Sequence, residues 1–227
     1  MSYNIENYKE QGGKKWVVGA NGELLVEGVN SFGKKTDGNY SEFESDGTLK
    51  FNGHATVWND LPPNPIARSR TPASNNPTLT QFKGTIDQFT FAVNDYVADN
   101  FEILHEYKEG TDLVVHIHWT NNGTESIVKY VRWQFEYTIA NAHSAFSDVV
   151  TLNTADIEIP ADTPDRTHFV TNIGNISGEN LKIGAVFSYN IKRVTATGTA
   201  PVANPFGLQV APHIEIDTVG SRLIFTK

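Results

Sequence analysis

The amino-acid sequence predicts an all-β protein: an antiparallel β-sandwich or jelly roll that carries a short N-terminal segment of β-repeats. Two observations lead to this fold class. Several segments alternate between apolar and polar side chains and are separated by polar turns, which is typical of strands with one buried face. The 227 residues also include 13 Phe, 8 Tyr and 4 Trp, enough large side chains to fill the core of a sandwich.

The clearest strand covers residues 112–119, whose side chains alternate between two faces. One face carries the large apolar residues Leu113, Val115, Ile117 and Trp119. Residues 127–139 alternate in the same way, with an apolar face formed by Ile127, Val131, Trp133, Phe135, Tyr137 and Ile139. The Asn-Asn-Gly sequence at 121–123 lies between them and is typical of a hairpin turn, because Asn and Gly tolerate positive φ. We therefore expect these two strands to pair.

The remaining strands complete one β domain, which we place at 78–227. They are predicted at 85–93, 166–173, 181–193 and 211–219. The only helical signal is at 139–147, and Asn and Ser weaken it. Residues 59–77 contain five prolines and are predicted to be a linker, because proline lacks a backbone donor and favours extended chain. A similar stretch at 195–207 is predicted to be a projecting loop.

A short internal repeat distinguishes the N-terminal segment, residues 1–58. Residues 21–28 and 46–53 both match the pattern Asn/Asp-Gly-x-Leu-x-(Val or Phe)-x-Gly. Each copy is a turn followed by a short strand with two apolar residues, which are Leu24 with Val26 and Leu49 with Phe51. So small a β unit is marginal in water by itself. We therefore expect these side chains to anchor the segment on a capsid or between protomers.

Composition restricts the partners and the stabilising chemistry. The formal charge of −8 disfavours binding to the phosphate backbone of nucleic acids. With no cysteine, disulfides and thiolate-bound zinc are excluded. No apolar run is long enough to cross a membrane, and the first residues lack the apolar stretch of a signal peptide. We expect a protein made in the cytoplasm without processing or membrane insertion.

The strongest cluster of polar residues joins two predicted strands. His116 and His118 alternate along one, and His213, Glu215 and Asp217 alternate along the other. If the strands pair, imidazoles and carboxylates meet on one face. Hydrogen bonds between them, along a sheet or at a trimer axis, are the favoured interpretation. A site for Zn²⁺, Mn²⁺ or Fe²⁺ is the alternative, but no metal is predicted because the spacing to a third ligand is unsupported.

Catalytic motifs are not recognisable in the sequence. It contains no Gly-x-Ser-x-Gly elbow, no phosphate loop and no dinucleotide fingerprint. We predict no enzymatic activity and no cofactor. Aromatic residues that could stack on sugar rings are Trp58, Tyr96, Phe101, Tyr107 and Phe206. We favour core or interface positions for most of them, with contact to a host-surface glycan as the alternative.

Several motifs together resemble a widespread family of tailed-bacteriophage virion proteins, the head fibre and capsid decoration proteins. The residues that carry this resemblance are Val57-Trp-Asn-Asp-Leu61, Leu104-His-Glu-Tyr-Lys-Glu-Gly-Thr-Asp112 leading into Val115-His-Ile-His-Trp119, Trp133-Gln-Phe-Glu-Tyr137, Ile139-Ala-Asn141 and Ile214-Glu-Ile-Asp-Thr-Val-Gly-Ser-Arg222. They span residues 57–227. The resemblance implies a β-rich, non-enzymatic surface component of the virion that forms homotrimers.

A second, shorter resemblance concerns the N-terminus. Tyr8-Lys-Glu-Gln-Gly-Gly13 followed by Trp16-Val-Val18 is similar to the capsid-binding end of phage head fibres. It implies that Tyr8, Gln11, Gly12, Gly13 and Trp16 contribute to attachment to the capsid or to neck and tail proteins. The alternative function is a receptor-binding tail fibre or spike module whose distal loops recognise a bacterial surface glycan.

Overall fold

Two compact units make up the chain. A computed structural model describes residues 16–18, 24–26, 30–44, 47–60, 64–65, 74–221 and 224, with side chains described for 31–44, 47–56, 74–221 and 224. The N-terminal unit comprises Met1–Val57 and Ile216–Val219, and the β domain comprises Trp58–Glu215 and Gly220–Lys227. Residues 216–219, which the sequence placed at the end of the 78–227 domain, thus group with the N-terminal unit.

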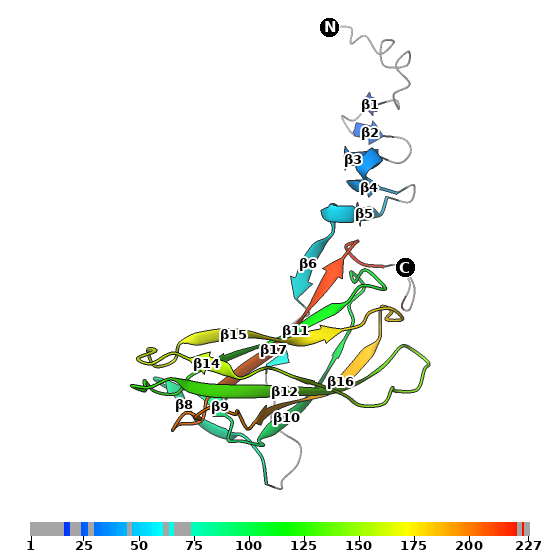
Figure 1. The fold of residues 1–227 in the computed structure, drawn as a ribbon. Coiled ribbons are helices and arrows are strands. Elements are labelled where there is room, and N and C mark those ends of the chain that lie inside the picture. Colours follow the sequence, from blue (N-terminus) through cyan, green and yellow to red (C-terminus); the bar gives the residue numbers. More distant parts are fainter. Residues whose placement is uncertain are drawn as a thin grey trace. The chain divides into compact units, whose positions relative to one another are not determined.

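Short antiparallel strands form the N-terminal unit (Figure 1). Strand β1 (Trp16–Val18) pairs with β2 (Leu24–Val26). A second sheet contains β3 (Asn30–Lys34), β4 (Asn39–Phe43) and β5 (Leu49–Asn52), with the 3₁₀ turns η1 (Lys35–Asp37) after β3 and η2 (Gly53–Ala55) after β5. The strand predicted in each copy of the repeat is therefore present, as β2 and as β5.

Gly53, the last residue of the second repeat, must be a glycine for two reasons. Its φ is +57°, a conformation that side chains disfavour. A Cβ on Gly53 would also lie 2.5 Å from the carbonyl oxygen of Gly38. Beyond β5, Phe51 N donates to Asp217 O at 2.7 Å, so residues 216–219 extend this sheet.

Two antiparallel sheets form the β domain (Figure 1). The first has the order β10 (Tyr96–Glu102), β16 (Val186–Val194), β12 (Lys129–Ala140), β13 (Val150–Asn153), and β14 (Ile157–Ile159) also pairs with β12. The second has the order β15 (His168–Ile176), β11 (Leu113–Thr120), β17 (Phe206–Ile216), β9 (Ile86–Thr90), β8 (Thr78–Lys83). β6 (Val57–Asp60) and β7 (Asn64–Pro65) also pair with β17.

The core lies between the inner faces of the two sheets. On β11, Leu113, Val115, Ile117 and Trp119 are fully buried, and on β12 the alternating residues Val131, Trp133 and Phe135 are buried as well. The rings of Trp119 and Trp133 lie 6.2 Å apart between centroids, so the two sheets meet there. Phe91 adds an edge-to-face contact with Trp133 at 5.4 Å. The predicted all-β sandwich is confirmed, and so is the apolar face of β11. The predicted apolar face of 127–139 is confirmed for Val131, Trp133, Phe135 and Tyr137, but Ile127 precedes β12 and is 57% exposed, and Ile139 is half-buried.

The predicted hairpin between 112–119 and 127–139 is wrong. β11 pairs with β15 and β17, whereas β12 pairs with β13, β14 and β16 in the other sheet. The Asn-Asn-Gly sequence instead carries the chain from one sheet to the other. Both strands present large apolar faces, and placing these faces opposite each other buries more apolar surface than placing them side by side in one sheet.

The connections also differ from what the sequence predicts. β12 continues to Ala140, and 141–149 forms turns rather than helix, with His143 at φ +63°. Within the predicted linker, residues 59–60 lie in β6 and 64–65 form β7. The predicted projecting loop, 195–207, is held down along its length, because Tyr130 N donates to Thr199 O at 2.9 Å and Val202 N donates to Glu125 Oε1 at 2.8 Å.

Replacement of Leu113 by Ala tests the assigned core. Leu113 is fully buried, so Leu113→Ala should lower the free energy of unfolding by about 3–5 kcal/mol, through lost apolar burial and the cavity left behind. Leu79→Ala is the matched control, because Leu79 lies on β8 with 58% of its surface exposed, and its effect should stay near 0.5 kcal/mol. Urea denaturation of both variants measures the difference, and equal effects would contradict the assigned core.

Candidate functional site

Three of the predicted polar residues meet on the outer face of the second sheet. His116 and His118 lie on β11, and His213 lies on the neighbouring β17. The Nε2 atoms of His116 and His118 share a hydrogen bond at 2.9 Å. The ring of His213 lies edge-on to that of His116, with 4.4 Å between centroids. The predicted pairing of the two histidine-bearing strands is therefore present.

A fourth histidine, not singled out from the sequence, continues this line. His168 at the start of β15 shares a hydrogen bond from Nε2 to Nδ1 of His118 at 2.9 Å, and the two rings stack at 5.1 Å. We call His213, His116, His118 and His168 the histidine row. It runs from the half-buried His213 through the buried His116 and the half-buried His118 to the exposed His168. Alternation of His168 with Val170 in the predicted strand 166–173 was the signal that could have revealed it.

The two predicted carboxylates, Glu215 and Asp217, have hydrogen bonds elsewhere. Glu215 Oε1 accepts from Lys108 Nζ at 3.0 Å, and its backbone oxygen accepts from Lys108 N at 2.7 Å. Asp217 belongs to the N-terminal unit, where its backbone oxygen accepts from Phe51 N. Within the described part of the chain, no group of three or more His, Cys, Asp or Glu residues is arranged to hold a metal ion. The described chemistry of the row is hydrogen bonding between imidazoles.

The predicted attachment residues lie in the N-terminal unit. Tyr8, Gln11, Gly12 and Gly13 fall outside the described residues. Trp16 is paired with Val26, and Val18 with Leu24, in the β1–β2 ladder. Leu49 and Phe51 are half-buried on β5.

Register places the apolar residues of the β3–β4–β5 sheet on one side. Phe32 is opposite Ser41, Ser41 is opposite Phe51, and Phe43 is opposite Leu49. Because directly opposed residues share a face, Phe32, Phe43, Leu49 and Phe51 form what we call the apolar face. Phe32 and Phe43 contact each other edge-to-face and are 61% and 43% exposed. Among the described side chains of this unit, no apolar one is buried.

The opposite side of this small sheet is polar. Glu42 is buried there and accepts from Lys35 Nζ at 3.0 Å. Lys35 also lies over the ring of Tyr40, 4.9 Å from its centroid. The buried Glu42 therefore serves an ion pair, while the apolar residues on the other side of the sheet remain partly or largely exposed.

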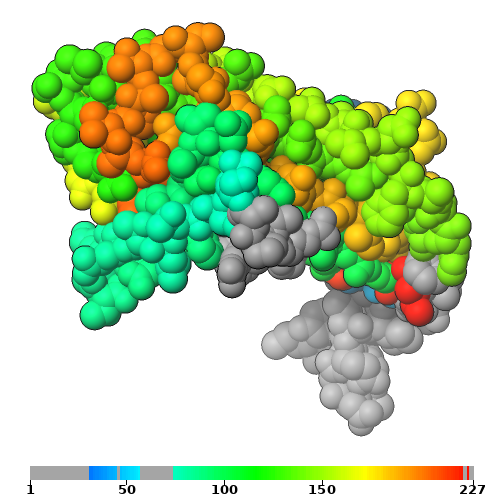
Figure 2. Space-filling view, turned by 90° about the horizontal axis from the view of Figure 1, so that it is seen from below, coloured from blue at the N-terminus to red at the C-terminus, as the bar shows by residue number. Residues whose placement is uncertain are grey.

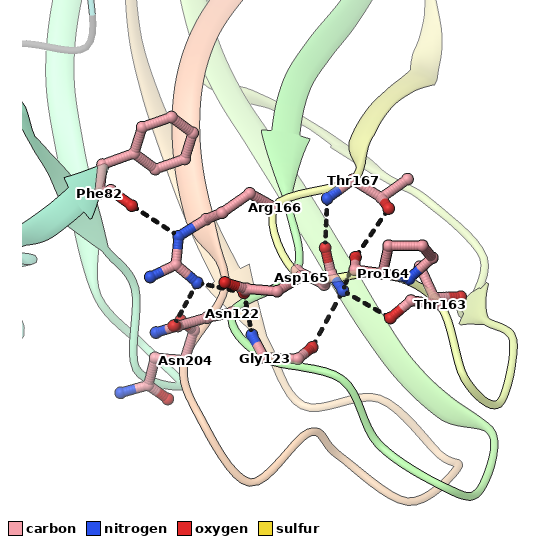
Figure 3. Close-up of polar contacts among 10 residues, drawn as sticks. Phe82, Asn122, Gly123, Thr163, Pro164, Asp165, Arg166, Thr167 and Asn204 are labelled. Atoms are coloured by element: carbon pink, nitrogen blue, oxygen red, sulfur yellow. Dashed lines mark hydrogen bonds and ion pairs between the residues drawn. The ribbon is translucent and has the colours of Figure 1, made fainter. Parts of the chain in front are cut away.

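Asn121 organises the loops at one end of the β domain, and Figure 3 labels its partners Gly123, Pro164 and Thr167. It is buried, and its Nδ2 donates to Gly123 O at 3.0 Å and to Pro164 O at 2.8 Å. Its Oδ1 accepts from Thr167 N at 2.7 Å. These bonds join the crossover after β11 to the 163–167 turn. This explains why the Asn-Asn-Gly sequence is needed although no hairpin forms.

Arg166 extends the same network, which we call the loop clamp (Figure 3). Its Nε donates to Phe82 O at 3.0 Å, and its Nη1 donates to Asn122 Oδ1 at 2.7 Å. The guanidinium lies over the ring of Phe206 at 4.5 Å. Arg166 adopts φ +63°, which is uncommon for a residue with a long side chain. These contacts therefore hold a backbone conformation that would otherwise be disfavoured.

The clamp draws together segments that are distant in sequence. Asn122 Nδ2 donates to Asn204 O at 3.0 Å, and Phe91 N donates to Pro205 O at 3.0 Å. Figure 2 shows residues near 200 (orange), the green segment after β11 and the β8–β9 segment (teal) gathered at one end of the domain. This end is therefore a preorganised loop surface.

Buried Arg193 supports the loop end from inside. Its Nη1 donates to Phe91 O at 2.7 Å and to Asn204 Oδ1 at 2.8 Å. Burial lowers the pKa of the Arg193 guanidinium, and the charge of Asp95 opposes this shift. Burial likewise raises the pKa of Asp95. Asp95 Oδ2 accepts from Ala92 N at 2.7 Å. We infer a structural role, because both groups bond to residues of the loops.

The aromatic residues considered for sugar stacking are mostly internal. Phe101, Tyr107 and Phe206 are buried, and Tyr96 is half-buried. The Tyr107 hydroxyl donates to Thr111 O, and burial raises its pKa to about 12. The side chain of Trp58 is outside the described residues.

Comparisons with known proteins assign no family to this chain. No family model and no curated protein matches it. A chain in a structure of infectious bursal disease virus Gx strain is similar at a TM-score of 0.27 and 7% identity, over 66% of this chain and 40% of that chain. At so low a score, the likeness indicates neither a shared family nor a shared function. Among the described residues, no helix is long and apolar enough to span a membrane.

Replacement of Asn121 by Ala tests the loop clamp. It should lower the free energy of unfolding by about 1–3 kcal/mol, because buried backbone groups lose their partner. Asn175→Ala is the matched control, since Asn175 is exposed on β15, and its effect should be within about 0.5 kcal/mol. Denaturant titration compares the variants. If Asn121→Ala left the free energy of unfolding unchanged, the loops would have to be held by other contacts.

The carboxylate of Asp156 should contribute a pH-dependent part of the stability. Its Oδ2 accepts from the hydroxyl of Thr197, from Gly198 N at 2.9 Å and from Thr197 N at 2.7 Å. These hydrogen bonds lower the pKa of the Asp156 carboxyl, and the bond from the Thr197 hydroxyl has the largest effect. Because the folded pKa is below the unfolded value of about 3.9, the contribution is fully present above that pH and is lost as pH falls through the folded pKa.

Asp156→Asn measures this contribution. Thermal unfolding at pH 7 should show the variant less stable than the wild type, and the difference should shrink as the pH falls below about 4. Asp162→Asn is the control, because Asp162 is an exposed residue of the neighbouring loop. A difference that stays constant between pH 7 and pH 3 would contradict the role given to the Asp156 charge.

Proposed function

We propose that this chain is a non-enzymatic structural protein of a bacteriophage virion, a head fibre or capsid decoration component that attaches through its N-terminal unit and displays the β domain. The observation that carries the proposal is the contrast in burial between the two units. The β domain has a complete core between its sheets, whereas the described N-terminal side chains include no buried apolar residue. The resemblance of residues 57–227 to phage virion proteins adds the biological setting.

The apolar face gives the attachment a physical basis. Phe32 is 61% exposed and Phe43 is 43% exposed, and both lie on a sheet of three short strands. Fully burying one such ring contributes about 1.5–3 kcal/mol. A sheet of this size gains little stability in water unless another surface covers its apolar side. Contacts with other protomers, in a homotrimer, and with a capsid protein would supply that cover.

The loop clamp favours a second function, recognition of a bacterial surface glycan by the loop end. Loops fixed before binding lose little conformational entropy when a ligand arrives, and a trimer would present three such surfaces and raise avidity. A glycan array probed with the purified oligomer tests this function. A glycan-binding signal that is lost in Arg166→Ala would favour this function. If no glycan bound, only the structural role would remain.

Replacement of the exposed rings tests the attachment. Size-exclusion chromatography with light scattering should show the wild-type chain as a trimer, and Phe32→Thr/Phe43→Thr should shift it towards monomer, because the apolar cover between protomers is lost. Binding to particles of the phage that encodes the chain should fall in parallel.

The double variant Leu79→Thr/Ile86→Thr is the matched control. Each of these residues is 58% exposed, on β8 and β9 of the β domain, and their replacement should leave both the oligomer and capsid binding unchanged. A monomeric wild-type chain that does not bind particles would refute the proposed function.

A further inference from the structure

The outer face of the first sheet has a shallow hollow of about 240 Å³. It lies over the adjacent strands β12 and β16, next to the start of β13. Pockets for drug-sized ligands measure roughly 300–1,000 Å³, so this hollow suits a smaller ligand. Tyr137 and Tyr189 are buried in the core and form its floor. The side chains around it are those of Glu136, Thr138, Val149, Ser188 and Asn190.

Strand register explains why the polar side chains of the hollow meet. Glu136 is directly opposite Asn190, and Thr138 is directly opposite Ser188, in the β12–β16 ladder. Opposed side chains share a face of the sheet, with Cβ atoms about 4.5–5.5 Å apart. Because the intervening Tyr137 is directed into the core, its neighbours on the strand are directed outward. The hollow is therefore lined by two facing pairs of polar groups.

Three of these four polar groups are not used inside the described part of the fold. No hydrogen bond or ion pair joins Glu136, Ser188 or Asn190 to any residue that the structure describes. The Thr138 hydroxyl donates to Ser147 O at 2.6 Å, which leaves its oxygen able to accept. Ser188 is exposed, and Glu136 and Asn190 are half-buried. A ligand can therefore reach these groups without displacing an internal bond.

Charge around the hollow favours a neutral ligand. Glu136 is the one carboxylate among the described residues that line it. Lys192 lies two residues beyond Asn190 on the same face of β16, diagonal to Glu136, and diagonal neighbours are roughly 7–8 Å apart. One carboxylate and one ammonium group balance each other, so neither an anion nor a cation is strongly favoured. Calcium would also need about six or more oxygen ligands, which a single carboxylate does not supply.

The hydrogen-bonding groups match a ligand with several hydroxyls. The carboxylate of Glu136 accepts hydrogen bonds, whereas Asn190 and Ser188 can both donate and accept. Each hydroxyl of a sugar also donates one bond and accepts others, so neighbouring hydroxyls can satisfy this set. Val149 is 69% exposed, and Val186, two residues before Ser188 on the same face, is 37% exposed. These two side chains offer apolar surface to the C–H groups of a sugar ring.

We propose that this hollow, the outer-face hollow, binds one neutral sugar unit. Glu136 accepts from neighbouring hydroxyls of the sugar, and Asn190 and Ser188 complete its hydrogen bonds. Because the rings of Tyr137 and Tyr189 are in the core, neither can stack on the sugar, and we expect a Kd on the order of 1 mM. None of the lining residues belongs to the loop clamp, so this site is separate from the loop end. The inference does not depend on the proposed virion role.

Saturation-transfer NMR on the full-length chain tests the outer-face hollow. The probes are glucose, galactose, mannose and N-acetylglucosamine, each titrated over about 0.5–20 mM to bracket the expected Kd. At least one sugar should receive saturation and titrate to a plateau. Glu136→Gln should weaken its binding about tenfold, because hydrogen bonds to a charged carboxylate are stronger than those to an amide. Absence of transfer to all four sugars would overturn the proposal.

Glu158→Gln is the matched control for the loss of the carboxylate. Glu158 is exposed on β14, which pairs with the same strand β12, but it does not line the hollow. This variant should bind the sugar as the wild type does. Equal losses in Glu158→Gln and Glu136→Gln would overturn the proposal, because the effect would then come from the charge of the whole domain.

Ser188→Gln tests the location of the site independently of charge. It places a larger side chain at an exposed position, so the midpoint of thermal unfolding should stay within about 2 °C of the wild type. Sugar binding should be abolished, because the added atoms occupy the hollow. Binding that survives in Ser188→Gln would overturn the proposal. So would binding that is lost in Arg166→Ala but kept in Glu136→Gln, because the sugar would then lie at the loop end.

Discussion

The contact between Trp119 and Trp133 is the constraint on which the rest of the β domain depends. These residues lie on the central strands β11 and β12 of opposite sheets, both are fully buried, and each is part of an alternating apolar face. Once these faces oppose each other, β11 and β12 cannot be neighbours in one sheet. The chain must cross between the sheets after Thr120, and the loop clamp is built around that crossing.

The outer face of β11 follows from the same alternation. With odd-numbered residues 113–119 directed inward, His116 and His118 are directed outward, where β15 and β17 bring His168 and His213 beside them. At the crossing itself, Asn121 donates to the carbonyl of Pro164 in the 163–167 turn, and Arg166 donates to the carbonyl of Phe82 at the β-bulge of β8. One set of groups consists of imidazoles joined by hydrogen bonds. The other forms neutral and charged bonds that fix the loop end as a surface.

The strands of the N-terminal unit also alternate between apolar and polar residues, but no second sheet is described over their apolar face. Its apolar face consists of Phe32, Phe43, Leu49 and Phe51. These residues alternate as in a core, but no described side chain of the unit covers them. The proposed virion role assigns that cover to other protomers and the capsid. Under that proposal, the β domain is stabilised by its own packing, and the apolar face of the N-terminal unit is covered on assembly.

The sequence by itself determined the all-β class, the inward residues of β11 and β12, and the short strands of the N-terminal repeat, because each depends on local alternation along one strand. Sequence reasoning placed His116 and His118 on one face of a strand and His213 on another strand, and the structure supplied the pairing of these two strands. Only the tertiary structure decided that Asn121 lies at a crossover rather than in a hairpin and that His168 joins the row. It also decided that Arg166 links its own turn to Phe82 of β8, to Asn122 and to Phe206 at the start of β17. Those features depend on which strands become neighbours, a choice governed by the total apolar surface buried between sheets and not by any single segment.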